Sequence, residues 1–155
     1  MRVEEWMNRD VVTVRPDDSF RTAMHLIRQK GIRQLPVVEG KRLVGIVTDR
    51  DLRQTSPSGV AGLSIHELHH VLEKLTVRQI MTTRVVSIRP DQTVEDAALL
   101  LLAHRIGGLP VVQDGELVGL ITEGDILQAF LQLRGKGPLD IAESVVAIEQ
   151  GNRAP

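Results

Sequence analysis

A long internal repeat constrains this chain more than any other feature of its sequence. Residues 44–52 read Val-Gly-Ile-Val-Thr-Asp-Arg-Asp-Leu, and residues 118–126 read Val-Gly-Leu-Ile-Thr-Glu-Gly-Asp-Ile, 74 positions later. The residues around both stretches repeat at the same offset. One unit of about 50 residues buries too little apolar surface to be stable alone. We therefore expect two similar halves that pack on each other about a pseudo-twofold axis and share a core.

The sequence pattern predicts the same order of elements in both halves: strand, helix, strand, strand, helix. Residues 11–17 and 85–91 are rich in β-branched side chains and contain a proline, which ends a strand because it has no N–H to donate. Ser19 and Thr93 can cap the helices that follow. The remaining strands are expected at residues 35–38, 43–47, 109–112 and 117–121, with hairpin turns at 39–41 and 114–115. The predicted fold class is α+β, with two β-α-β-β-α repeats packed by pseudo-twofold symmetry.

The first long helix of each repeat carries one apolar stripe at helical spacing. These stripes consist of Phe20, Ala23, Met24 and Ile27 in the first repeat, and of Val94, Ala97, Ala98 and Leu101 in the second. The second helix adds Leu99, Leu100 and Leu102, so it is apolar nearly all round. We expect it to be buried on two sides.

The chain divides into four segments. We expect the first repeat at residues 3–53, an inter-repeat loop and helix at 54–76, the second repeat at 77–133, and a C-terminal tail at 134–155. Inside the inter-repeat segment, residues 55–59 read as a loop, and Ser64 with Glu67 forms a capping box that opens a helix. The tail has apolar residues at helical spacing after Asp140, which predicts a short docked helix.

Composition argues against several classes of function. A net charge of −1 provides no long-range field for nucleic acid or anionic lipid, and only three aromatic side chains are available for stacking on bases. The absence of cysteine excludes disulfides, thiol nucleophiles and thiolate metal sites. The N-terminus lacks the apolar core of a signal peptide, and no apolar run is long enough to span a bilayer. We expect a soluble, cytoplasmic protein.

The Thr-x-x-Asp corner that ends each repeated stretch is the strongest candidate site. A strand there delivers a hydroxyl, free backbone N–H groups and a carboxylate to the start of a helix, an arrangement that suits a phosphorylated sugar. The same residues could simply form a capping box with Asp in place of the usual Glu. That alternative leaves Gly45 and Gly119 unexplained, because glycine weakens a strand unless something approaches it closely.

Residues 66–70, His-Glu-Leu-His-His, match the H-E-x-x-H signature of zinc metalloproteases. A helical wheel places Ile65, Leu68, Leu72 and Leu75 in a buried stripe and the first and last histidines on the opposite, polar face. A zinc ion there would lie open to bulk water with no visible third ligand. The chain also shows no nucleophile–base pair, so we predict that it is not an enzyme and has no catalytic cofactor or metal.

The repeated motifs resemble a known family. Two units of Val-Val-Thr/Ser-Val/Ile-Arg-Pro-Asp, Leu-Pro-Val-Val and Leu-Val-Gly-h-h-Thr-x-x-Asp (h apolar) are similar to a cystathionine-β-synthase (CBS) domain pair over about residues 3–131. The inter-repeat segment, with Ser56-Pro57 and His66-Glu67-Leu68, looks like that of the acetoin-utilisation subgroup. Members of that subgroup often carry an ACT domain after the pair, which we do not expect within these residues.

The resemblance implies an adenosine ligand (AMP, ADP, ATP or S-adenosylmethionine) bound in clefts between the repeats. The Asp of each corner would hold the ribose diol and the Thr would meet phosphate, with the base against the segment that leads into the opposite repeat, residues 81–86 or 7–12. A basic residue three positions before the Leu-Pro-Val proline would meet phosphate; it is Arg33 in the first repeat but Gly107 in the second. The position equivalent to Arg50 in the second repeat is likewise a glycine, Gly124, which favours phosphate binding in the first cleft. The implied site residues are Arg33, Pro36, Ile46, Thr48, Arg50, Asp51, Val12, Val86, Thr122 and Asp125.

The function implied is a regulatory module that senses adenine nucleotide and passes binding on to a partner or to its own oligomer. The helices after each corner, extended by Phe130 and Leu131 in the second repeat, should expose apolar surface that predicts a homodimer. The alternative is a dimerisation module that binds no ligand.

Overall fold

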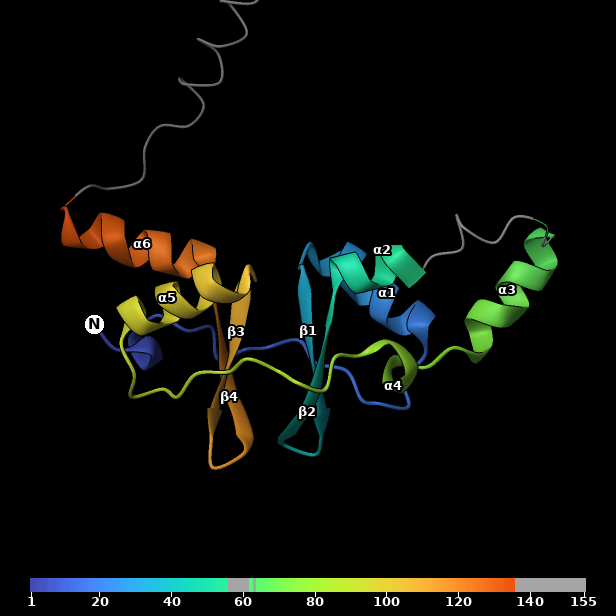
Figure 1. The fold of residues 1–155 in the computed structure, drawn as a ribbon, viewed down its shortest axis with the longest axis horizontal. Helices are drawn as coiled ribbons and strands as arrows, with labels where there is room; N and C mark the ends of the chain where they lie inside the picture. Colours follow the sequence, from blue (N-terminus) through green and yellow to red (C-terminus); the bar gives the residue numbers. More distant parts are fainter. Residues whose placement is uncertain (56–61, 63, 136–155) are drawn as a thin grey trace, which may run out of the picture.

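Two β-hairpins form the centre of the computed structural model, which describes residues 1–55, 62 and 64–135. One hairpin pairs β1 (Gln34–Glu39) with β2 (Arg42–Thr48), and the other pairs β3 (Gly108–Gln113) with β4 (Glu116–Thr122). The strand order is β1-β2-β4-β3, and β2 meets β4 only at Arg42 and Glu116. The hairpins therefore lie side by side and diverge from this contact (Figure 1). Both carry a bulge at the same place, between Val37 and Val38 and between Val111 and Val112.

Each hairpin is covered by its own pair of helices. Helices α1 (Phe20–Lys30) and α2 (Asp49–Thr55) lie beside β1 and β2, and α5 (Val94–His104) and α6 (Glu123–Leu133) lie beside β3 and β4 (Figure 1). Ser19 and Thr93 cap α1 and α5 as predicted, accepting hydrogen bonds from the N–H of Thr22 and of Asp96. Three residues of each predicted stripe are buried: Phe20, Ala23 and Ile27 in α1, and Val94, Ala97 and Leu101 in α5.

The first strand predicted for each repeat is reduced to a single β-bridge. Val14 bridges Val37, and Ile88 bridges Val111, both in parallel orientation. The ladder cannot continue because the next N–H groups are used elsewhere: that of Arg15 donates to Asp18 Oδ2 (2.7 Å) and that of Arg89 to Gln92 Oε1 (3.0 Å). The prolines that follow have no N–H. Residues 11–17 and 85–91 are thus extended connections and not strands.

The segment that leads into each half packs on the other half. We call these two segments, residues 3–8 and 77–82, the exchanged segments. A short helix, η1 (Val3–Glu5), places Val3 and Met7 in the core of the second repeat, together with Ile88, Leu109 and Ile121. Helix α4 (Val77–Ile80) contributes Val77 to the core of the first repeat. Each core is therefore completed by residues from the other half of the sequence.

Helix α3 (Ile65–Lys74) opens with the predicted capping box, in which Glu67 Oε2 accepts from the Ser64 N–H at 2.8 Å. The predicted buried stripe on this helix is wrong: no residue of α3 is buried, and Ile65 is 74% exposed. Only Leu72 on α3 and Leu75 after it pack against the first core, because α3 extends away from the sheet (Figure 1). Most of the predicted loop at 55–59 and the predicted tail helix lie outside the described residues.

Helix α5 is buried on one side only, contrary to prediction. Leu99 and Leu102 are 66% and 76% exposed, because α6 covers only part of the helix. With exposed side chains of α6 they form what we call the α5/α6 apolar surface, made up of Leu99, Leu102, Leu127, Phe130 and Leu133. No helix in the described ranges is long and apolar enough to cross a membrane.

Candidate functional site

Both Thr-x-x-Asp corners form the capping box that the sequence left as an alternative. At the end of β2, the N–H and the hydroxyl of Thr48 both donate to Asp51 Oδ2 at 2.8 Å, and the Asp51 N–H donates back to Thr48 Oγ1 at 3.2 Å. At the end of β4, the N–H and hydroxyl of Thr122 donate to Asp125 Oδ2 at 2.7 Å. These bonds fix each half-buried carboxylate through one oxygen.

The second oxygen of each carboxylate is available. Within the described part of the chain, Oδ1 of Asp51 and of Asp125 accepts no hydrogen bond. A carboxylate held at Oδ2 and free at Oδ1 can accept a ligand hydroxyl without losing its structural bonds. The capping box and a ligand site are therefore compatible at the same residue.

The two strand glycines are explained by the protein itself. A Cβ on Gly45 would lie 2.7 Å from Met81 Sδ and 3.1 Å from the Thr82 carbonyl oxygen. A Cβ on Gly119 would lie 2.5 Å from Met7 Sδ and 3.1 Å from the carbonyl oxygen of Asn8. The close approach that the sequence indicated is thus made by the exchanged segments, so these glycines are no sign of a ligand.

The exchanged segments are bonded to the strands that end at the two corners. Ile46 of β2 exchanges two backbone hydrogen bonds with Thr82, at 3.0 and 2.9 Å. Leu120 of β4 exchanges two with Asn8, both at 2.9 Å. The start of segment 81–86 is therefore bonded to the strand that ends at the Asp51 corner, and the start of segment 7–12 to the strand that ends at the Asp125 corner. Val86 and Val12 are half-buried at the ends of these segments.

A cavity of about 610 Å³, which we call the inter-repeat cleft, is lined by residues of both halves. Three predicted residues meet there: Arg33, Thr48 and Arg50. The sequence did not predict the others, which are Gln34, Asp49, Arg53 and Gln54 from the first repeat, and Arg105, Ile106 and Glu123 beside Gly107 from the second. Asp51, Asp125 and Thr122 do not line the cleft, and Pro36 is fully buried in β1, where it offers no surface to a ligand.

The inter-repeat cleft is rich in positive charge. Four guanidinium groups line it, against the carboxylates of Asp49 and Glu123. Arg53 is paired with Asp49, and the hydrogen bond between them holds the pKa of that carboxyl below its ordinary value of 3.8, with smaller contributions from the charges of Arg33 and Arg28. The other three arginines, at positions 33, 50 and 105, are exposed and make no ion pair within the described residues. The cleft therefore suits an anionic group.

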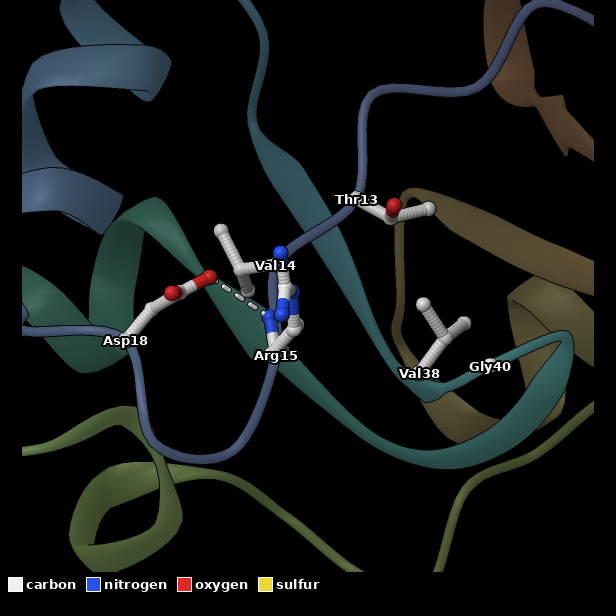
Figure 2. Close-up of a pocket in the computed structure, with 6 residues that line it drawn as sticks. All are labelled: Thr13, Val14, Arg15, Asp18, Val38 and Gly40. Carbon is white, nitrogen blue, oxygen red and sulfur yellow. Dashed lines mark hydrogen bonds between the residues drawn. The ribbon is translucent and has the colours of Figure 1, made fainter.

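Two further hollows lie outside the inter-repeat cleft. One, of about 480 Å³, is lined by Thr13, Val14, Arg15, Asp18, Val38 and Gly40 of the first repeat alone (Figure 2). The Arg15 N–H donates to Asp18 Oδ2 and closes a turn there, so this carboxylate oxygen already has a partner in the protein. The other, of about 180 Å³, lies where Arg9, Val11 and Lys41 approach β4. The second hollow thus borders segment 7–12, which was predicted to contact the base at the Asp125 corner, but neither hollow contains one of the ten implied site residues.

Comparison with known proteins identifies the family of this chain. A model of the CBS domain matches residues 3–57 and 77–132. An inosine-5'-monophosphate dehydrogenase of Korarchaeum cryptofilum is 37% identical over 126 residues, which make up 81% of this chain but 23% of that protein. The chain thus spans about a quarter of this relative, and the similarity does not extend to the whole enzyme.

Several solved structures superpose on most of this chain. AcuB of Vibrio cholerae, named for acetoin utilization, superposes with a TM-score of 0.73 at 29% identity and covers 89% of this chain and 98% of its own. CBSX2 of Arabidopsis thaliana in complex with AMP gives 0.73 at 31% identity, covering 86% and 98%. The CBS pair of MJ0100, in complex with 5'-methylthioadenosine and S-adenosylmethionine, gives 0.68 at 26% identity, covering 84% and 95%. The repeats, the exchanged segments and these matches together show that the chain belongs to the CBS domain family, as a tandem CBS pair.

Proposed function

We propose that this CBS pair is a regulatory module that binds an adenine nucleotide, with the ribose at the Asp51 corner. The observation that carries the proposal is a cleft lined by Thr48 and by three arginines that make no ion pair within the described residues, beside an Asp51 whose Oδ1 accepts no hydrogen bond there. The ligands named for CBSX2 and MJ0100 share an adenosine group, which supports the same ligand class here. Binding that holds the two halves together would be passed on to a partner or to the oligomer.

Each part of the ligand has a matching group in the protein. The ribose hydroxyls would donate to Asp51 Oδ1, as charge-assisted hydrogen bonds. A phosphate would meet the guanidinium groups of Arg33 and Arg50 beside Thr48, because the N–H and hydroxyl of Thr48 are already bonded to Asp51. The adenine would lie toward segment 81–86, where Val86 is half-buried.

The two corners should not bind equally. The second repeat has Gly107 and Gly124 where the first has Arg33 and Arg50, so only the Asp51 corner offers local cations at both positions. We infer that it is the dominant site and that the Asp125 corner is mainly structural.

A catalytic role has no support in the residues that suggested one. Glu67 is bonded to the Ser64 N–H at the start of α3, and that bond is the main reason why its pKa lies below the ordinary value. His66 and His70 are exposed on the same short helix. No group of three potential metal ligands is found among the residues that the structure describes. We propose that the H-E-x-x-H match is fortuitous.

A ligand-free dimerisation module is the rival proposal, because the capping boxes and the Met–Gly contacts account for both motifs without a ligand. The α5/α6 apolar surface supports a dimer under either proposal. At the equivalent positions the first repeat has His25, Arg28 and Arg53 in place of Leu99, Leu102 and Leu127. We propose a homodimer in the cytoplasm in which this surface of one copy meets that of the other.

Calorimetry on three variants tests the nucleotide proposal. Asp51→Ala should weaken AMP binding by about 10- to 150-fold, because it removes charge-assisted hydrogen bonds worth roughly 1.5–3 kcal/mol. Asp125→Ala is the matched control, since it removes the same capping group but should change the tightest site little. Arg33→Ala should lower the affinity for AMP and leave that for adenosine nearly unchanged.

Melting curves of the variants separate lost binding from lost folding. A ligand that binds only the native state should add about 2.7 kcal/mol of stability at 100 times its dissociation constant. Two equal sites per chain would contradict the dominance of the Asp51 corner. Tight binding that is lost only with Asp125→Ala would show that the dominant site is in the second repeat. No shift with AMP, ADP, ATP or S-adenosylmethionine would favour the ligand-free rival.

A further inference from the structure

Arg105 has a backbone conformation that favours glycine. It follows α5 with φ 54° and ψ 46°, in the left-handed region. The equivalent position after α1 is Gly31, with φ 61° and ψ 29°. A side chain is disfavoured in this region because Cβ crowds the backbone, and glycine avoids the strain at no steric cost. The second repeat therefore keeps an arginine where the fold alone favours glycine, as strained positions at functional sites often do.

The arginine side chain lies at the inter-repeat cleft. Arg105 lines the cleft from the second repeat, while Arg33, Arg50 and Arg53 line it from the first. It is exposed and makes no ion pair among residues 1–55 and 64–135. Of the residues that line the cleft from the second repeat, it is the one with a positive charge.

Two glycines near Arg105 leave room for a side chain of the first repeat. A Cβ on Gly107 would meet only the Gln34 Nε2 at 3.4 Å and Glu123 at 3.9 Å, and a Cβ on Gly108 would collide with the Gln34 side chain. Gln34 thus crosses from the first repeat onto these glycines. Cations of both repeats line the same cavity of about 610 Å³.

We propose that Arg105 binds the terminal phosphates of a nucleoside di- or triphosphate whose ribose is held at Asp51 and whose first phosphate is held by Arg33 and Arg50. This inference rests on the proposed function and adds the part of the ligand that the second repeat recognises. A monophosphate held by the first repeat leaves Arg105 without a partner, whereas a longer phosphate chain contacts cations of both halves. The planar guanidinium fork suits phosphate oxygens. Arg105 is then the residue that distinguishes ATP from AMP, and its contact joins the two repeats.

The variant Arg105→Gly tests this with little risk to folding. It removes the guanidinium and gives the left-handed position the residue that the first repeat has there. The melting temperature without ligand should stay the same or rise. Lys74→Ala is the matched control for the loss of one positive charge, because Lys74 is exposed at the end of α3 and away from the cleft.

Calorimetry with adenosine, AMP and ATP at constant ionic strength gives the result. The wild-type chain should bind ATP more tightly than AMP. Arg105→Gly should weaken ATP binding by about tenfold, the loss expected for one charge-assisted contact. AMP and adenosine should change less than about twofold, since exposed charges beyond the contact are screened by salt. Lys74→Ala should change none of the three.

An unchanged ATP affinity in Arg105→Gly, or equal losses for AMP and ATP, would overturn the assignment of Arg105 while adenosine and AMP still bind. A wild-type chain that binds none of the three ligands would instead overturn the proposed function, and this inference with it. The adenosine measurement therefore tells the two failures apart.

Discussion

Replacing Gly119 by alanine should show that packing against Met7 and Asn8 requires a glycine in β4. The added Cβ would lie 2.5 Å from Met7 Sδ, 2.9 Å from Met7 Cγ and 3.1 Å from the Asn8 carbonyl oxygen. Met7 is 8% exposed within the second core, so its side chain has little room to turn away. Asn8 is held by two hydrogen bonds of 2.9 Å to Leu120, so its carbonyl can move only if these lengthen.

The size of the effect follows from these contacts. Overpacking a well-packed site costs about 1–3 kcal/mol. Weakening the two backbone hydrogen bonds adds about 1 kcal/mol in all, the net worth of one such bond. We expect Gly119→Ala to lower the free energy of unfolding by roughly 2–4 kcal/mol. For a chain of this size that corresponds to a melting temperature lower by roughly 4–16 °C.

Thermal and urea unfolding with two controls checks the reasoning. Gly124→Ala makes the same substitution five positions later, where the added Cβ meets only Thr122 Oγ1 at 3.7 Å, so stability should stay within about 1 kcal/mol of wild type. In a Met7→Ala background the penalty of Gly119→Ala should shrink, because the thioether that it strikes is gone. A penalty as small as that of Gly124→Ala, or one unchanged by Met7→Ala, would refute the packing explanation.

Two further predictions concern charge and assembly. Because the hydrogen bond from Arg53 lowers the pKa of Asp49 in the folded state below 3.8, the pair stabilises the fold above that value, and the contribution is lost as pH falls through the lowered pKa. Arg53→Ala should return the Asp49 pKa toward 3.8 in an NMR titration, and an unchanged pKa would contradict the cause assigned. For the dimer, Leu102→Glu should give a monomer by light scattering while Arg28→Glu, at the equivalent position of the first repeat, leaves the dimer intact, because only the former charges the α5/α6 apolar surface. A wild-type chain that is monomeric at micromolar concentration would contradict the proposed dimer.

Local signals in the sequence predicted the elements that local physics determines. Ser19 and Thr93 cap helices, and the turns form where Gly40 and Gly115 take positive φ, because capping and turn conformation depend on a few neighbouring residues. The exchange of leading segments was implied only by the family resemblance, for the opposite reason. Nothing in the periodicity near Val3 or Met7 shows that these residues pack with Ile121, more than a hundred positions away.

The candidate site was predicted in part for a similar reason. The Thr-x-x-Asp motif is contiguous, so its corner could be found by matching the two repeats, whereas Arg33 was implied by the family resemblance. Arg105 was missed because that comparison marks it only as a difference from Gly31, and its place in the cleft depends on how the halves pack. The available signal was the arginine at a helix-ending position where the other repeat has glycine. Gly45 misled the prediction, since a close approach in a strand does not say whether protein or ligand makes it.

The two kinds of group at this site should contribute differently to binding. Asp51 is already fixed by three hydrogen bonds with Thr48, so accepting a ribose hydroxyl immobilises nothing further. The exposed arginines at 33, 50 and 105 must be ordered when phosphate binds, at about 0.5–1.5 kcal/mol for each side chain. Their attraction is also screened by salt, whereas a short bond at a half-buried carboxylate is screened much less. We therefore expect the rigid corner to recognise adenosine, and the exposed arginines to select for the phosphate chain with a contribution that falls as ionic strength rises.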